Sequence, residues 1–249
     1  MFITNNYSAD KADIRHTSID SDEVAATTNR HYFNDTIVNP YPELDESNWA
    51  CWKHISFEVS IILFIYVVNK IGQEIVVSSV PLLSTEMIGW NASQVGYFMA
   101  IMGFLVLPAN IIVSRLSREV EDRNVMIYLN SISLACIAIL MNTTLIRYSL
   151  FQYILGSTSL FIFLNALEGI IMSMLSKLVS PELAKGTFNS GLLATEAGTV
   201  GRVVGDLIIT WMGLMQSTTT LVNLLFGPIG LGVILCGIIV NRYYDRLEV

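Results

Sequence analysis

Three ionisable residues lie inside a stretch that is otherwise apolar enough to cross a membrane. Glu196, Arg202 and Asp206 interrupt the hydrophobic run at 187–213. A charge at the centre of a bilayer costs about 2.5–3.5 kcal/mol on the insertion scale, so such residues usually face a bundle interior or a wet cavity. Arg202 and Asp206 are four residues apart and share a helix face, where they can pair. Because a guanidinium binds oxyanions bidentately, Arg202 is a candidate anion contact; a purely structural bridge to Asp206 is the alternative.

Small and polar residues surround these charges in the same run. Gly198 and Gly205 are seven residues apart, and Gly201 and Gly205 form a G-x-x-x-G pattern. Small residues let a neighbouring helix approach closely, so this pattern predicts tight helix packing. Thr195 lies close to Arg202 on a helical wheel, and with Asn189 it could add hydrogen bonds to a bound solute.

A second polar face occurs in the run at 55–83. Tyr66, Lys70, Gln73 and Glu74 fall on one side of a helix there. Lys70 is the second candidate for an anion contact, and a simple bridge to Glu74, four residues later, is its alternative.

The third run with an internal charge is 149–179, where Asn165 and Glu168 are three residues apart. An intramembrane carboxylate can carry a proton, or it can pair with Arg202 or Lys70 on a neighbouring helix. We expect four acids within these runs to balance charge or to couple protons: Glu74, Glu168, Glu196 and Asp206.

Long apolar helices must position these groups. From residue 55 onward six hydrophobic runs follow one another, at 55–83, 93–116, 125–146, 149–179, 187–213 and 221–241. Each can span a hydrocarbon core of about 30 Å as a helix. Only 14% of the chain is charged, against about 25% in soluble domains. The sequence therefore predicts an all-α integral membrane protein with six transmembrane helices, in contact with the lipid bilayer.

The first 54 residues differ in character from the rest. They hold nine acidic residues against four Lys or Arg and show no helical or strand periodicity. We therefore expect a flexible cytosolic tail at 1–54 and a membrane domain at 55–249. Eleven Lys or Arg lie in the tail, in the breaks after the second and fourth runs and at the C-terminus, whereas the other breaks hold only Arg147. This bias predicts that both termini are cytosolic.

Several functional classes are disfavoured. The net charge of −7 comes mostly from the tail and argues against a nucleic-acid partner. All three histidines lie in that tail, and the three cysteines form no metal-binding pattern. We therefore expect no metal, no cofactor and no enzymatic activity.

Two blocks of sequence resemble a known family. They are "LPANIIV" followed by "EDR" within 107–123, and "GTFNSGLLATEAGTVGRVVGD" at 186–206, with "LEG" at 167–169 between them. The pattern is similar to the C-terminal transmembrane half of the SPX-domain vacuolar phosphate transporters of plants and their protist relatives, a group within the major facilitator superfamily. Lysosomal facilitators of the CLN type look like more distant kin. The resemblance covers residues 55–240.

The resemblance implies a twelve-helix transporter in two halves, with the solute site between the halves and alternating access by rocking. The six runs would be helices seven to twelve, and Glu121, Asp122 and Arg123 would form the loop that steadies the cytosolic gate. It also implies inorganic phosphate as solute and a vacuolar or other endomembrane. A second six-helix half would have to come from another chain or from a missing N-terminal half, so a monomer of this chain would be incomplete.

Three functional hypotheses follow. The first is half of a transporter for phosphate or a similar small anion, with Lys70 and Arg202 as anion contacts. The second is a non-transporting membrane subunit or a remnant whose charges only hold helices together. The third is an anion channel or a facilitator for another solute, as the lysosomal kin suggest.

Overall fold

The computed structural model describes residues 55–141, 149–179, 190–214 and 218–247, without the side chains of 218–220. The expected cytosolic tail at 1–54 lies outside these residues. Throughout the described part the regular structure is helical, and the helices are α2 (Phe57–Ile88), α3 (Ala92–Glu119), α4 (Asp122–Leu140), α5 (Leu150–Leu178), α7 (Ser190–Gly213), α8 (Thr218–Arg242) and the short 3₁₀ helix η2 (Tyr244–Leu247). The long helices coincide with the six predicted runs to within a few residues at most ends.

Local signals in the sequence set where α2 and α3 begin and end. The Ser56 side chain accepts a hydrogen bond from the Val59 amide at 3.3 Å and caps α2. Gly89 ends α2 in a left-handed conformation with φ of 74°, which glycine adopts without a steric penalty. Asn91 and Gln94 then form a reciprocal capping box that starts α3. The chain therefore reverses direction between two long helices within a few residues.

Five of these helices are long and apolar enough to cross a membrane: α2, α3, α4, α5 and the Leu221–Arg242 part of α8. The described chain is thus an all-α integral membrane protein of several spans. The exception is α7, whose 24 residues include Glu196, Arg202 and Asp206. Those three charges lower its apolar character, and a sixth span there remains a prediction.

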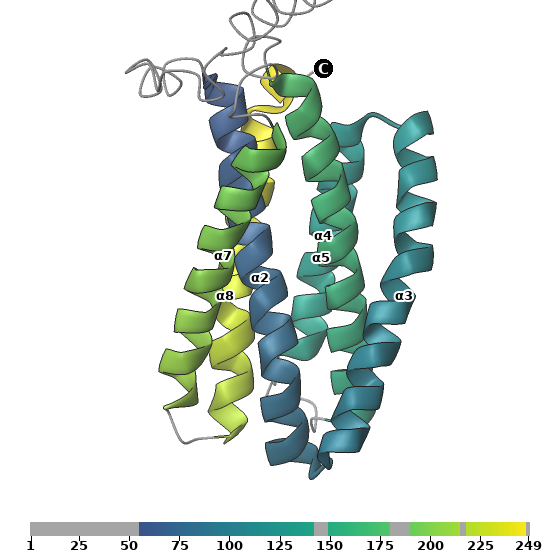
Figure 1. Cartoon of the computed structure of the whole chain (residues 1–249), viewed down its shortest axis with the longest axis vertical. Coiled ribbons are helices and arrows are strands. Elements are labelled where there is room, and N and C mark those ends of the chain that lie inside the picture. The colour runs from purple at the N-terminus through teal and green to yellow at the C-terminus, as the bar shows by residue number, and fades with distance from the viewer. Residues whose placement is uncertain (1–54, 142–148, 180–189, 215–217, 248–249) are drawn as a thin grey trace, which may run out of the picture. The chain divides into compact units, whose positions relative to one another are not determined.

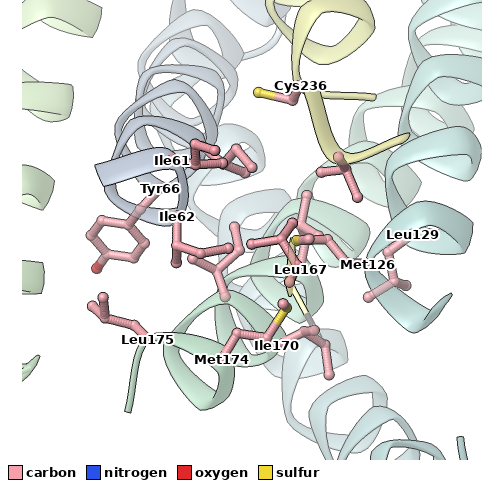
Figure 2. Close-up of a cluster of buried hydrophobic side chains, with 14 of the residues drawn as sticks. Ile61, Ile62, Tyr66, Met126, Leu129, Leu167, Ile170, Met174, Leu175 and Cys236 are labelled. Carbon is pink, nitrogen blue, oxygen red and sulfur yellow. The ribbon is translucent and has the colours of Figure 1, made fainter. Parts of the chain in front are cut away.

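Helix α2 is the centre of the bundle. In Figure 1 it lies between α7 and α8 on one side and α4 and α5 on the other, and it packs against α5, α7 and α8. One cluster of buried apolar side chains joins α2, α4, α5 and α8; Figure 2 labels ten of its members. Tyr66 lies at the edge of that cluster, and its hydroxyl points away from the centre (Figure 2). The apolar core thus gives way to polar groups on one side of α2.

Glycines bring α7 against α2, as the G-x-x-x-G pattern predicts. Gly198, Gly201 and Gly205 are buried in this contact. A Cβ atom added at Gly201 would lie 2.6 Å from Lys70 Cβ and 2.9 Å from the Val67 carbonyl oxygen. No side chain fits between backbones that are this close, so the prediction of tight packing is confirmed.

Helix α3 is the least enclosed of the long helices. Its buried residues are Val95, Phe98 and Met102, all in its first half. In its second half large apolar side chains are exposed, among them Leu107 at 60% and Ile112 at 66%. Much of α3 therefore has no protein packed against it within the described residues.

Candidate functional site

A buried ion pair lies at the middle of α2. Lys70, only 7% exposed, places its Nζ 2.6 Å from Oε1 of Glu168 on α5. The side chain of Glu168 keeps 25% of its surface accessible. Sequence spacing suggested Glu74 as the partner of Lys70, and this is wrong: Glu74 instead accepts a hydrogen bond from the Ser78 hydroxyl at 3.3 Å. Helix packing rather than spacing along α2 decides the pairing.

Two further side chains of α2 complete this group. Gln73 accepts a hydrogen bond from Lys70 Nζ at 3.1 Å through its Oε1 and donates one to Glu168 Oε2 at 2.9 Å through its Nε2. Tyr66 donates its hydroxyl to Glu168 Oε1 at 3.2 Å, and Lys70 Nζ lies 5.6 Å from the centre of the Tyr66 ring. We call Tyr66, Lys70, Gln73 and Glu168 the polar cluster. Tyr66, Lys70 and Gln73 each contact the Glu168 carboxylate, and Tyr66 and Gln73 also contact the Lys70 cation.

The polar cluster continues toward a carbonyl of α5. Asn69 Nδ2 and Gln73 Nε2 both donate to the Leu164 carbonyl oxygen, at 3.1 and 3.0 Å. The other amide atom of Asn69, Oδ1, is buried and has no hydrogen-bond partner among the described residues. A buried acceptor without a partner costs about 1–3 kcal/mol, so this corner of the bundle is polar beyond what packing alone requires.

The charges of α7 lie on its exposed side. Thr195, Glu196, Arg202 and Asp206 are all exposed. No ion pair joins Arg202 to Asp206 in the described structure, so the bridge considered as the alternative role of Arg202 does not form there. Thr195 donates its hydroxyl to the Gly191 carbonyl at 2.8 Å. Asn189, the fifth expected site residue here, lies outside the described residues.

The expected gate loop lies at the end of the bundle where α3 turns into α4. Asp122 is 7% exposed and accepts hydrogen bonds from three side chains, with Lys177 Nζ at 2.7 Å and Ser173 Oγ at 2.9 Å, both on α5. The third donor is Ser117 on α3. A carboxylate with three donors holds the α3–α4 turn against α5.

Arg123 connects the same turn to the C-terminal segment. It pairs with the exposed Glu121 at 2.7 Å, and its guanidinium carbon lies 4.2 Å from the centre of the Tyr244 ring. The Tyr244 hydroxyl in turn donates to Asn124 Oδ1 at 2.7 Å. A cavity of about 330 Å³ borders this turn and is lined in part by Asp122, Arg123 and Lys177. Figure 1 shows the α3–α4 turn and the ends of α5 and α8 at one end of the bundle.

Several contact residues received no role from the sequence, among them Tyr66, Gln73, Lys177 and Tyr244. Tyr66 and Gln73 share a helix face with Lys70, and that spacing is a signal that could have included them. Lys177 and Tyr244 gave no such signal, because their partners are 55 and more than 100 residues away. Within the described part of the chain no three His, Cys, Asp or Glu side chains gather as a metal site would require.

The chain is similar to several membrane proteins of plants. An SPX domain-containing membrane protein of Arabidopsis thaliana is 37% identical over 174 residues, which is 69% of this chain and 24% of the relative. A second from the same plant is 38% identical over 159 residues, 63% of this chain and 22% of the relative. One from Oryza sativa subsp. japonica is 35% identical over 173 residues, 69% of this chain and 25% of the relative.

This chain therefore spans about a quarter of the length of the relatives it matches. No protein-family model matches the chain, and no solved structure does. The similarity establishes homology to a part of SPX domain-containing membrane proteins, in agreement with the apolar helices of the structure.

Proposed function

We propose that this chain is one six-helix half of a major facilitator-type transporter, which moves inorganic phosphate or a similar small anion across a vacuolar or other endomembrane. No cofactor and no enzymatic step belong to this proposal. The observation that carries it is the polar cluster, because a lysine only 7% exposed lies in the middle of a membrane-spanning bundle. A buried cation of this kind is costly and is usually retained for a function.

The anion would bind by replacing Glu168 at Lys70. In the described conformation Glu168 is paired with the lysine, and its side chain, which keeps 25% of its surface accessible, marks the side from which a solute could approach. Tyr66 and Gln73 already donate to that carboxylate and could donate to an anion in the same place. The displaced Glu168 would then balance charge or take a proton. Glu74, which is half-buried beside α7, is a second acid for that role.

The exposed side of α7 would line the other part of the route. Arg202 and Asp206 lie there with Thr195 and Glu196, on a helix that contacts α2 along its glycines. Two charges of opposite sign without a mutual ion pair are available to a solute or to a facing helix. We propose that a second six-helix half covers this side and the exposed part of α3. That half could be a missing N-terminal segment, a second copy or another chain.

The gate and the orientation are part of the same proposal. Asp122, Arg123 and Glu121 join α3, α4, α5 and the C-terminal segment at one end of the bundle. Contacts of that kind would keep this end closed until the helices rock. Since Arg118, Arg123 and Lys177 all line the cavity there, we propose that this end and both termini face the cytosol.

Uptake of labelled phosphate tests the proposal. Vesicles are prepared from cells that make the full chain and from cells that lack it. Arg202→Gln should lower phosphate uptake at least about tenfold, because it removes a charge-assisted contact, without lowering the amount of protein in the membrane. Arg242→Gln, at an exposed position at the end of α8, is the matched control and should leave uptake unchanged. Equal uptake with and without the chain would refute the proposal.

A non-transporting subunit is the second candidate, and one observation favours it. Lys70 and Glu168 already satisfy each other, and the α2–α7 contact resembles ordinary helix packing. In that case Arg202→Gln should reduce assembly or abundance instead of uptake. An anion channel or a facilitator for another solute is the third candidate, which competition by chloride, sulfate and sugars would separate from phosphate transport.

A further inference from the structure

We propose that Glu168 makes the polar cluster selective for oxyanions that carry a hydroxyl proton of their own, as phosphate does, over fully deprotonated oxyanions such as sulfate. This rests on the proposed function, and it concerns how the same site would discriminate among anions. The sequence assigned Glu168 to charge balance, to proton coupling or to an ion pair with Arg202 or Lys70, and gave it no part in selectivity.

The geometry places an acceptor and several donors around one small space. Lys70 Nζ and Tyr66 Oη both lie within 3.2 Å of Glu168 Oε1, and Gln73 Nε2 is 2.9 Å from Glu168 Oε2. An anion that reaches Lys70 must therefore lie against the carboxylate it displaces. The three donors suit the bare oxygens of any oxyanion, and the carboxylate suits only an O–H group.

The net charge of the polar cluster favours the same anions, those that carry a hydroxyl. Lys70 and Glu168 together are neutral, and an added anion leaves the cluster negative inside a membrane-spanning bundle. A hydroxyl on that anion turns a contact between two lone pairs into a charge-assisted O–H···O⁻ hydrogen bond. Near neutral pH every phosphate or arsenate ion keeps at least one hydroxyl, whereas sulfate has none. Sulfate would bind with its oxygen facing the carboxylate oxygen, which is repulsive.

The side chain that orients this acceptor is Gln73. Its amide bonds to Lys70 through the oxygen and to Glu168 and the Leu164 carbonyl through the nitrogen. Because the Leu164 carbonyl belongs to the backbone of α5, the amide cannot rotate without breaking a bond to a fixed group. Gln73 is thus a positioning residue that keeps the second carboxylate oxygen of Glu168 directed toward the cluster.

Competition for labelled phosphate uptake in vesicles with the wild-type full chain is the first test. Unlabelled phosphate and arsenate should inhibit at similar concentrations. Sulfate and monofluorophosphate should inhibit equally only at concentrations about 10- to 100-fold higher, as expected for the loss of one hydrogen bond to a charged group. Monofluorophosphate is the sharper probe, because it has nearly the size of phosphate and lacks the hydroxyl at neutral pH.

The second test changes the acceptor. Glu168→Gln offers an N–H to a bare oxygen, so the sulfate-to-phosphate ratio of inhibitory concentrations should fall to within about threefold of unity. Glu86→Gln, at an exposed position near the end of α2, is the matched control and should keep the wild-type ratio.

The outcomes separate the two proposals. A wild-type chain that takes up no phosphate refutes the proposed function, and the selectivity fails with it. A wild-type chain that takes up phosphate and is inhibited equally by sulfate and monofluorophosphate refutes the selectivity alone. A Glu168→Gln chain that takes up phosphate and still excludes sulfate also refutes it. If that variant does not reach the membrane, the wild-type competition series decides.

Discussion

The contact between α7 and α2 should tolerate no side chain at Gly201. In Gly201→Ala the new Cβ would lie 2.6 Å from Lys70 Cβ and 2.9 Å from the Val67 carbonyl oxygen. Carbon atoms in contact are separated by about 3.5–4.0 Å. One of the two neighbours is backbone and the other is the first atom of a side chain, so neither can rotate away. Helix α7 must therefore move from α2 by about 1 Å.

That displacement has an estimable cost. Overpacking of this kind destabilises proteins by about 1–3 kcal/mol, and alanine regains about 0.5–1 kcal/mol over glycine in a helix. The net loss of unfolding free energy should be about 1–2 kcal/mol, which lowers the melting temperature of a chain this size by about 2–8 °C. The cost should be smaller in Gly198→Ala, whose nearest neighbour would be 3.3 Å away on the Tyr66 ring.

Thermal unfolding of the purified variants in one detergent measures this effect. Gly103→Ala on α3 is the control, because nothing lies within 4 Å of its new Cβ, and it should be as stable as the wild type or slightly more so. The packing argument is refuted if Gly201→Ala melts at the same temperature as Gly103→Ala.

Two further predictions concern the ion pairs. Glu168→Gln should lower the free energy of unfolding by about 3–5 kcal/mol, because it leaves a buried lysine without its carboxylate. Lys70→Met should lower it by less, because Glu168 keeps two hydrogen-bond donors and partial access to water. Thermal unfolding of both variants measures this, and equal losses would contradict it. Asp122→Asn should increase hydrogen exchange across the α3–α4 turn, because it weakens charge-assisted bonds from three side chains, and Asp245→Asn, an exposed position, should not.

Much of the fold could be predicted because membrane helices have a length requirement. The six apolar runs coincide with the six long helices, and the spacing of Gly201 and Gly205 predicted their close packing. Both properties lie within one segment of the chain. The sixth span, at α7, is not among the candidate spans of the structure, because its three charges weaken the apolar signal on which the prediction depends.

The pairing of the charges could not be predicted, since it depends on which helices are neighbours. Spacing along α2 and α7 suggested that Lys70 pairs with Glu74 and Arg202 with Asp206, and neither pair forms in the described structure. Lys70 instead reaches across to Glu168 on α5. The sequence allowed this pair as one of several options, and only the packing of α5 against α2 selects it.

The distance between these partners along the chain matters for how the protein is made. Tyr66 and Glu168 are 102 residues apart, and at a synthesis rate of about 5–20 residues per second α5 follows α2 by about 5–20 s. During that interval Lys70 has no carboxylate from α5, and α2 carries an uncompensated charge worth about 2.5–3.5 kcal/mol at mid-membrane. Placing α2 among lipids is therefore less favourable before α5 has been made than after it.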